Sequence, residues 1–396
     1  MEKHLRKQKS MESIKKIVQK EILNGELAGA VLAVQKNGDT VFQWEAGYAD
    51  IQRKKTVNRN SIFRLYSMSK PITAVGAAIL WERGELDYMA PLKEYLPYFK
   101  GMEIVTEEGK RIPAKKEIHI IDLLRMTSGL VYPDPDIAGI YMDRLFTKVQ
   151  GKIEQGEHID TQQLCKMVAK QPLAFEPGEH WRYGFSADVL GAVIEVVSGK
   201  RLSQFYREEI FEPLEMDDTG FYVPRDKQSR LVQLYKWTKE QGLAVEEKRH
   251  LCLTKCLEPP CFESAGAGIV STLSDCIKFA NMLADRGKYP GGRILGEKAI
   301  RMFEQNQIPE ELEKELNFEH MQGYGYGNLM RIYMDPVKAL TLGDIGEFGW
   351  DGWTGTYLSV NPREKSSIIF LIQRCGYVNP ALIRKLRNAI YTLLED

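Results

Sequence analysis

A serine stands three residues before a lysine at the point where a long apolar helix is expected to begin. Residues Ser67 to Lys70 read Ser-Met-Ser-Lys and are followed by Pro71, a residue that helices accept in their first turn. The next segment, from Ile72 to Trp81, is almost entirely apolar, so this helix should lie in a core. Residues three apart share a helix face, and Lys70 can therefore reach the hydroxyl of Ser67. A serine is a weak nucleophile until a neighbouring base takes its proton, which makes this pair a candidate for acyl transfer.

The overall composition excludes some classes of function without selecting one. The chain has 396 residues with 54 basic and 54 acidic side chains, so it has no net charge that would attract nucleic acid. This length allows two or three domains, or one large unit of two parts. No stretch approaches the roughly 18 uninterrupted apolar residues of a membrane-spanning helix, and the basic N-terminus lacks the apolar region of a secretory signal. We expect a cytoplasmic protein that does not bind nucleic acid.

Six cysteines are too sparse for a disulfide scaffold, although three of them form a cluster with a histidine. His250, Cys252, Cys256 and Cys261 are separated by one, three and four residues. Structural zinc sites typically use pairs of cysteines separated by two residues (Cys-x-x-Cys), and the spacings in this cluster do not match that pattern. Reduced, partly buried thiols are the favoured interpretation and zinc is the alternative, so no metal or cofactor is expected.

Strand patterns occupy the two ends of the chain, and helix patterns occupy the middle. Near the N-terminus, residues 28–35 and 40–48 flank an Asn37-Gly38 turn, which is a strong signal for a β-hairpin. Residues 11–22, which precede this hairpin, carry apolar side chains at helical spacing that should pack on a sheet rather than on a membrane. We expect further strands at 325–333, 339–342, 346–356, 356–360 and 367–373, and helices at 121–126, 187–197, 274–286, 297–305 and 380–394, with Ser274 as an N-cap.

This order of elements predicts an α/β (α+β) fold with one antiparallel sheet built from both termini. A mostly helical region is inserted between the two halves of the sheet. We assign residues 1–74 and 265–396 to the α/β domain and residues 75–264 to the helical domain. Ser67 lies close to the first boundary, so the active site is expected between the two parts.

Two later segments extend the pair of Ser67 and Lys70 into an ordered set of motifs. Residues 176–183 read as a turn that ends in Tyr183, directly before an apolar helix. Residues 346–356 carry four glycines, and glycine within a strand often marks the close approach of a ligand or another backbone. Without this order, Tyr183 would be interpreted as a core aromatic residue and the glycine-rich segment as an edge strand with a bulge.

In this order the motifs resemble those of the serine β-lactamase and penicillin-binding-protein superfamily. The resemblance is closest to its class C-like esterases of β-lactamase fold, carboxylesterase family VIII. It covers about residues 20–395, with lesser matches at 123–130 and 266–272. The family's Ser-x-x-Lys motif is matched by Ser67 and Lys70, its Tyr-x-Asn motif by Tyr183, Gly184 and Phe185, and its Lys-Thr-Gly motif by Trp350, Asp351 and Gly352.

The mechanism that the resemblance implies is a two-step acyl transfer. Ser67 attacks a carbonyl carbon to give an acyl-enzyme, which water or another acceptor then releases. Tyr183 would carry protons together with Lys70, and which of the two is formally the base stays open because coupled groups titrate as a pair. The backbone N–H groups of Ser67 and Trp353 would form the oxyanion hole.

Two of the motifs depart from the family pattern, and the departures bear on the substrate. Trp350 and Asp351 replace the lysine and threonine that precede the glycine. In relatives that lysine helps to hold a substrate carboxylate, whereas an indole cannot hold one and Asp351 would repel it. Phe185 replaces an asparagine that contacts a substrate amide. We expect Phe185, Trp350, Asp351 and Gly352 to contact the substrate in an aromatic site to which Trp181, Phe348 and Trp353 also contribute.

These features favour a serine hydrolase that acts as a carboxylesterase on small, neutral, apolar esters. The alternatives are a β-lactamase or D-amino-acid peptidase, an acyltransferase that uses the same intermediate, and a non-catalytic binding protein. An intact set of Ser67, Lys70 and Tyr183 argues against the last of these. The expected partner is a small-molecule ester or amide, and neither the natural substrate nor the oligomeric state follows from the sequence.

Other serine and glycine patterns receive structural interpretations. Ser128-Gly129 is as easily a helix C-cap as a second catalytic serine. The segment from Gly323 to Gly327 opens a strand and lacks the lysine of a P-loop. No Gly-x-Ser-x-Gly elbow is present, so an α/β-hydrolase fold is not supported.

Overall fold

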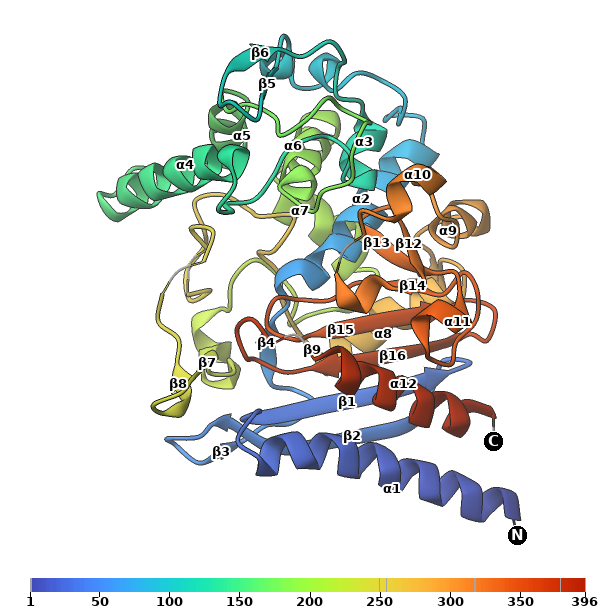
Figure 1. Ribbon diagram of the computed structural model, residues 1–396. Helices are drawn as coiled ribbons and strands as arrows, with labels where there is room; N and C mark the ends of the chain where they lie inside the picture. Colours follow the sequence, from blue (N-terminus) through green and yellow to red (C-terminus); the bar gives the residue numbers. More distant parts are fainter. Residues whose placement is uncertain (1, 249, 254, 317, 378, 396) are drawn as a thin grey trace.

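In the computed structural model, the central element is an eight-stranded antiparallel sheet (Figure 1). Strands from the two ends of the chain meet inside this sheet, where β1 pairs with β16 and Val31 lies opposite Leu371. This arrangement confirms the predicted fold class. In sheet order the strands are β12 (Tyr324–Gly327), β13 (Met330–Tyr333), β14 (Phe348–Gly349), β15 (Tyr357–Asn361), β16 (Ser366–Leu371), β1 (Gly29–Lys36), β2 (Asp39–Asp50) and β3 (Lys55–Thr56).

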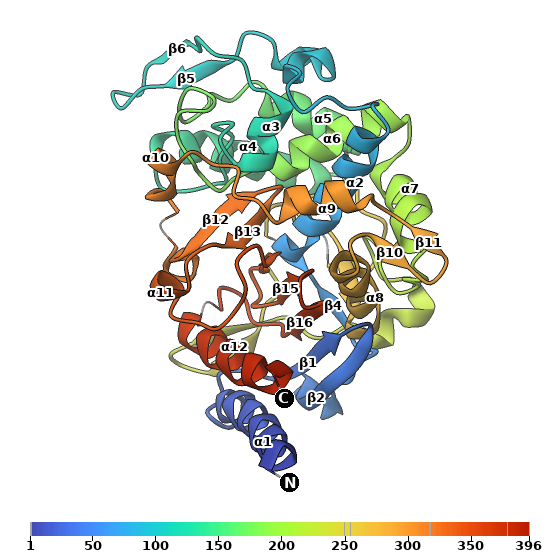
Figure 2. The same cartoon turned by 90° about the vertical axis from the view of Figure 1, so that its right-hand side faces the viewer.

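The two faces of the sheet pack against different layers because side chains alternate along each strand. On β1, Leu32 lies in the cluster formed with the terminal helices α1 (Glu2–Leu23) and α12 (Pro380–Glu395), whereas Val31 belongs to the main core. Figures 1 and 2 show these two helices side by side on one face of the sheet. Ile14 of α1 is fully buried there, which confirms the predicted packing of the N-terminal helix on a sheet.

The structure describes residues 2–248, 250–253, 255–316, 318–377 and 379–395. Within these ranges, no helix has the length and apolar character that crossing a bilayer requires.

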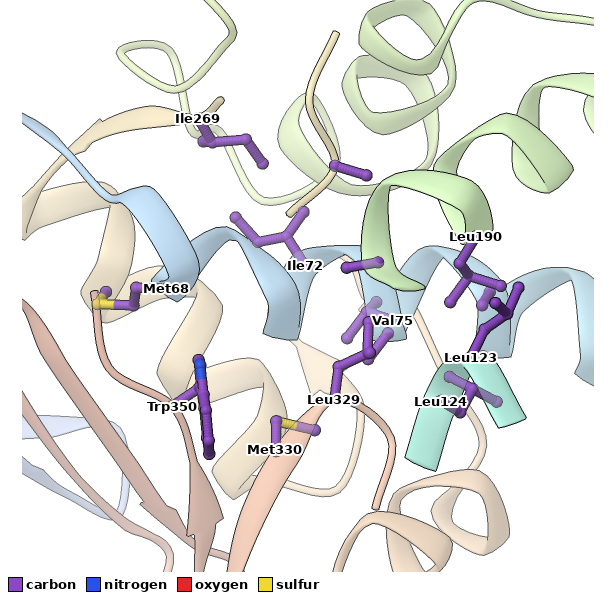
Figure 3. Close-up of a cluster of buried hydrophobic side chains, with 14 of the residues drawn as sticks. Met68, Ile72, Val75, Leu123, Leu124, Leu190, Ile269, Leu329, Met330 and Trp350 are labelled. Atoms are coloured by element: carbon purple, nitrogen blue, oxygen red, sulfur yellow. The ribbon is translucent and has the colours of Figure 1, made fainter. Parts of the chain in front are cut away.

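A mostly helical region covers the other face of the sheet and surrounds α2 (Lys70–Glu82). This helix packs against α6 (Ser186–Ser198), and a Cβ on Gly76 would lie 2.9 Å from the ring of Tyr206. Figure 3 shows Ile72 of α2 in a cluster of buried side chains that also contains residues from the sheet and from other helices. The remaining longer helices are α3 (Ile120–Arg125), α4 (Ile137–Glu154), α5 (Thr161–Val168), α7 (Leu202–Tyr206), α8 (Leu273–Ala284) and α9 (Glu297–Phe303).

A single hydrophobic cluster continues from the sheet into this helical region. The division into residues 1–74 with 265–396 and residues 75–264 therefore stays a prediction.

Two hairpins illustrate how local backbone conformation decides where strands end. The predicted hairpin forms between β1 and β2, with Asn37 and Gly38 at positive φ values of 55° and 85°. The segment 325–333 is a second hairpin rather than one strand, because Asn328 and Leu329 take left-handed φ values of 48° and 61°.

Two further expectations about the C-terminal half are also wrong. The strand predicted at 339–342 is absent from the described residues, because Pro336–Ala339 forms the short helix α11, capped by the side chain of Asp335. The N-cap of α8 is Thr272 rather than Ser274, since the Thr272 hydroxyl accepts the N–H three residues later at 3.2 Å.

A buried ion pair ties the C-terminal helix α12 to the sheet. Arg387 of α12 donates to Glu347, and the two side chains are only 1% and 2% exposed. The hydroxyls of Ser359 and Tyr391 also donate to Glu347. Burial opposes ionisation of this carboxyl, but Arg387 and the hydrogen bonds outweigh it and lower the pKa of Glu347.

Candidate active site

Ser67 lies at the start of the central helix, in the short 3₁₀ helix η1 (Tyr66–Ser69) that leads into α2. The backbone of Tyr66 takes a left-handed φ of 46°, a conformation that bulky residues adopt only where the surroundings enforce it. Lys70 is fully buried in the first turn of α2, and its Nζ donates to the Oγ of Ser67 at 3.1 Å. The structure thus brings together the two residues that the sequence analysis paired.

Three acceptors surround the amine of Lys70. Besides Ser67, they are the carbonyl oxygen of Gly266 at 2.9 Å and the hydroxyl of Tyr132 at 3.2 Å. Burial disfavours the charged form and lowers the pKa of Lys70 to about 7, although the negative charge of Asp188 acts in the opposite direction. A lysine with this pKa is partly neutral at physiological pH, and its lone pair can then accept a proton.

Tyr183 completes the group around the serine from the loop that precedes α6. Its Oη accepts a hydrogen bond from Nε1 of Trp350 at 3.0 Å, and the centre of its ring lies 4.7 Å from Nζ of Lys70. Burial raises the pKa of Tyr183 by more than its hydrogen bonds with Ser67 and Trp350 lower it. The phenol therefore stays protonated at physiological pH and can donate.

Two glycines allow the chain to bring these groups so close. A Cβ on Gly184 would lie 2.0 Å from the carbonyl oxygen of Leu130. A Cβ on Gly266 would lie 2.5 Å from Oδ2 of Asp188 and 3.2 Å from Oη of Tyr132. A side chain at either position would displace the segment that carries Tyr183 or the carbonyl that accepts from Lys70.

The sequence analysis missed two groups that contact this site, Asp188 and Tyr132. Oδ1 of Asp188 accepts from the hydroxyl of Ser264 at 2.5 Å and from the backbone N–H two residues later at 3.3 Å. Burial raises the pKa of Asp188, whereas the hydrogen bond from Ser264 and the charge of Lys70 lower it. Asp188 could have been found from the sequence, because it is a carboxylate inside an apolar helix, five residues after Tyr183. A buried charge needs a partner, and such a position therefore predicts an interaction with another polar group. Tyr132 carries no comparable signal.

The glycine-rich segment is a two-residue strand, β14, followed by a tight turn at 352–355, rather than the continuous strand that was predicted. This turn docks on the residues that precede Ser67. The hydroxyl of Thr356 donates to the carbonyl oxygen of Leu65 at 3.1 Å, and a Cβ on Gly352 would lie 2.3 Å from the same oxygen. Glycine at this position is therefore required by a close backbone approach.

Docking of the turn places Trp353 in the same cavity lining as Ser67. The centre of its ring lies 5.3 Å from that of Tyr66. Neither the N–H of Ser67 nor that of Trp353 donates to another residue in the described part of the chain. Two unused N–H groups near a nucleophile match the needs of an oxyanion hole, and this role stays a prediction.

A cavity of about 960 Å³ opens at Ser67, a size suited to a small-molecule ligand. Phe185 is not part of its lining, because this side chain is 2% exposed and packs between the rings of Tyr132 and Phe146. Trp181 and Phe348 also lie outside the lining. The predicted site residues that do line the cavity are Ser67, Tyr183, Trp350, Asp351, Gly352 and Trp353.

Asp351 has an ionic partner that its sequence neighbours do not reveal. Nη1 of Arg331, on β13, donates to Oδ1 of Asp351 at 2.7 Å, and the two side chains are 3% and 30% exposed respectively. Nη2 of the same arginine donates to the carbonyl oxygen of Leu358 at 2.9 Å. This mostly buried cation lines the cavity beside the carboxylate and reduces the repulsion of anions that was expected from Asp351.

Residues with alternative interpretations have structural contacts. Ser128 is buried, shares a hydrogen bond of 2.8 Å with the hydroxyl of Ser186, and does not line the cavity. His250 stacks on Trp353 with ring centres 4.1 Å apart, and Cys252 is buried against the cavity. Among the residues that the structure describes, no three His, Cys, Asp or Glu side chains are arranged to hold a metal ion.

Comparison with known proteins agrees with this geometry. The family described as Beta-lactamase matches residues 12–390. Esterase EstB of Burkholderia gladioli is 29% identical over 382 residues, which cover 92% of this chain and 91% of that protein. Among solved structures, EstCE1, described as a hydrolase with promiscuous acyltransferase activity, has a TM-score of 0.83 at 25% identity and covers 98% of this chain and 100% of its own.

A family VIII carboxylesterase has a TM-score of 0.70 at 19% identity, covers 97% of each chain, and shares the fold. These similarities confirm the resemblance to the serine β-lactamase and penicillin-binding-protein superfamily. Because the family match spans nearly the whole chain and includes every element of the site, the chain belongs to the Beta-lactamase family.

Proposed function

We propose that this protein is a serine esterase that cleaves small uncharged esters through an acyl-enzyme on Ser67. The observation that carries the proposal is the 3.1 Å contact between Oγ of Ser67 and Nζ of Lys70. Burial lowers the pKa of this lysine to about 7. A neutral amine at this distance can take the serine proton while the oxygen attacks a carbonyl carbon. The names of two relatives, an esterase and a hydrolase, support the same class of reaction.

The proposed reaction has two similar halves. The oxygen of Ser67 bonds to the carbonyl carbon, its proton passes to Lys70, and the carbonyl oxygen becomes an oxyanion facing the N–H groups of Ser67 and Trp353. When this intermediate collapses, the bond to the alcohol breaks, and the proton passes from Lys70 by way of the hydroxyl of Tyr183 to the leaving oxygen. Water then repeats the sequence on the acyl group and releases the acid.

The pKa directions favour Lys70 over Tyr183 as the base. A phenolate base would require a lowered pKa, whereas burial raises the pKa of Tyr183. The same burial lowers the pKa of Lys70 towards the range in which a general base is most effective. Tyr183 then acts as a protonated relay whose orientation is fixed by the hydrogen bond from Trp350.

A preference for uncharged substrates follows from how the polar groups near the serine are already used. The indole N–H of Trp350 donates to Tyr183, and the guanidinium of Arg331 is bound to Asp351 and to a backbone carbonyl. The indole N–H is therefore occupied, and the guanidinium, at 3% exposure and already paired with Asp351, is poorly placed to hold a substrate carboxylate. A neutral ester needs no such anchor, which favours an esterase over a β-lactamase or D-amino-acid peptidase.

The test combines active-site labelling with two kinds of substrate. A fluorophosphonate should modify Ser67, as located by peptide mass spectrometry, and p-nitrophenyl butyrate should be hydrolysed much faster than nitrocefin. Ser67→Ala should lose both labelling and hydrolysis, whereas Ser128→Ala, a buried serine outside the cavity, should keep them. More than about a hundredth of the wild-type rate in Ser67→Ala would exclude Ser67 as nucleophile.

The same experiment separates the esterase from its alternatives. Hydrolysis of nitrocefin at a rate equal to that of the ester would instead indicate a β-lactamase. Formation of a new ester when an acceptor alcohol is added would identify an acyltransferase, which uses the same acyl-enzyme.

A further inference from the structure

The lining of the cavity forms two contiguous walls that meet at Ser67. One wall begins with Tyr183 and continues through ring contacts with Trp350 at 5.3 Å and Phe318 at 6.0 Å, and His320 stacks on Phe318. The other wall consists of Tyr66, Trp353 and His250, whose rings lie 5.3 Å and 4.1 Å from one another in that order. A substrate that reacts with the serine therefore extends in two directions.

The position of Tyr183 shows which wall faces the alcohol part of an ester. If the protein is the esterase proposed above, the leaving oxygen receives its proton through the hydroxyl of Tyr183, so it must lie beside that hydroxyl. The alcohol then extends along the wall of Trp350 and Asp351. The acyl group extends along the other wall, past Trp353.

On the alcohol side, the more exposed charged group is the carboxylate of Asp351. Asp351 and its partner Arg331 both line the cavity, but the Asp351 side chain is 30% exposed and that of Arg331 only 3%. The guanidinium also lies over the ring of Tyr357, with 4.5 Å between them. The pair is therefore a dipole that presents its negative end to a bound alcohol, and Oδ2 of Asp351 has no hydrogen-bond partner among the described residues.

Arg331 is the only Lys or Arg in the described lining, and its guanidinium is bound to Asp351. Burial lowers the pKa of His320, so this ring is neutral at physiological pH. The remaining charged residues that line the cavity are all acidic: Asp143, Glu154 and Glu319.

We propose that Asp351 forms a subsite for the alcohol part of the ester and that the enzyme prefers alcohols carrying a protonated amine over alcohols carrying a carboxylate. An ammonium group near Asp351 would also face the rings of Phe318 and Trp350, which attract cations. Because Arg331 cancels part of the carboxylate charge, the preference should be moderate.

The test uses three butyrate esters that share one acyl group and differ only in the alcohol. These are the 4-(aminomethyl)phenyl, 4-(hydroxymethyl)phenyl and 4-(carboxymethyl)phenyl esters, with each rate corrected for the ester's spontaneous hydrolysis. In the wild type, kcat/KM for the ammonium ester should exceed that for the carboxylate ester about tenfold, which corresponds to about 1.4 kcal/mol. High salt should reduce this ratio, because exposed charges are screened.

Asp351→Asn keeps the shape of the side chain and removes its charge. The ratio should fall to about one or below, because the charge of Arg331 is then uncompensated. Asp285→Asn is the matched control, since it removes a surface charge that pairs with Lys365 outside the cavity. This control should keep the wild-type ratio.

The hydroxymethyl ester separates failure of the subsite from failure of the proposed function. If this neutral ester is hydrolysed but the wild-type ratio is close to one, or does not respond to salt, the subsite is refuted and the esterase stands. A wild-type ratio that survives in Asp351→Asn, with the neutral ester still turned over, would also refute it. If Ser67 is not labelled and the neutral ester is not cleaved, the proposed function itself fails.

Discussion

Replacement of Asp188 by asparagine tests the charge that the fold places behind Lys70. The two side chains have the same shape, and the amide oxygen can keep the hydrogen bonds from Ser264 and from the backbone N–H of Gly266. The substitution therefore removes one negative charge from a buried site without opening a cavity. Since Asp188 raises the pKa of Lys70 against the larger effect of burial, its loss should lower that pKa further.

The size of the shift follows from the path between the two groups. Only Gly266 separates them, because its N–H donates to Asp188 at 3.3 Å and its carbonyl accepts from Lys70 at 2.9 Å. Charges about 7 Å apart interact by roughly 2–3 kcal/mol at an effective dielectric constant of about 20. At about 1.4 kcal/mol per pKa unit this gives an upper limit of about two units, and we expect about one unit because hydrogen bonds partly neutralise the carboxylate.

The assay is the pH dependence of kcat/KM for p-nitrophenyl butyrate. In the proposed mechanism the neutral form of Lys70 is the base, so wild-type activity should rise with pH through about 7. A shift of one unit moves this rise to lower pH and makes the fraction of plateau activity at about pH 6 roughly five times larger in Asp188→Asn. Glu263→Gln is the matched control, because it removes a buried carboxylate that pairs with Arg201 and is not among the groups that shift the pKa of Lys70.

An unchanged midpoint in Asp188→Asn, with only the plateau reduced, would refute the electrostatic role and leave Asp188 as a structural residue. A shift towards higher pH would contradict the sign of the effect. The rate of fluorophosphonate labelling of Ser67 should follow the same profile, which makes the result independent of the ester chosen.

Three further substitutions test other parts of the molecule. Lys70→Met should abolish activity. The pKa of Lys70 is about 7 in the folded protein against 10.5 for a free lysine, so unfolding above about pH 7 takes up a proton. Between about pH 7 and pH 9, the free energy of unfolding measured in urea should therefore rise by about 2 kcal/mol more in the wild type than in the variant. Parallel pH dependences would contradict this. Gly352→Ala should lower kcat/KM at least about tenfold, because the new Cβ would lie 2.3 Å from a backbone carbonyl oxygen. Gly220→Ala is the control and should keep kcat/KM, because a Cβ at that position would meet no atom closer than 3.8 Å. Glu347→Gln should lower the free energy of unfolding by about 3–5 kcal/mol because it leaves Arg387 without an ionic partner at 1% exposure, and a loss below about 1 kcal/mol would show that the pair contributes little.

That Ser67, Lys70 and Tyr183 lie together could be predicted because each belongs to a short motif in a fixed order. Ser67 and Lys70 share one helical turn, and Tyr183 directly precedes a helix, so their relation is local. Asp188 and Arg331 could not be assigned in this way. Their roles come from segments that meet only in the folded chain, as when the carbonyl of Gly266 reaches a lysine almost 200 positions earlier.

Two of the wrong predictions, the strand at 339–342 and the N-cap at Ser274, concern segments whose sequence also carries the correct signal. Asp335 followed by Pro336 is typical of a helix start, with an N-cap and a proline at the first helical position. In the fold this signal outweighs the apolar residues that suggested a strand at 339–342. Thr272 and Ser274 are both good caps by residue type. The choice between them depends on where β9 (Val270–Thr272) stops pairing with its neighbour, which is a long-range property.

Pairing of the first strand with the last has a consequence for how the protein is made. Val31 lies opposite Leu371, a residue that the ribosome adds more than 300 positions later. At about 5–20 residues per second, roughly 15–70 s pass between the synthesis of β1 and that of its partner. During this time the nascent chain carries a hairpin with an apolar, unpaired edge, which is prone to join other chains. Chains released before Ser366 would keep that edge, so premature termination should yield aggregates rather than a smaller folded protein.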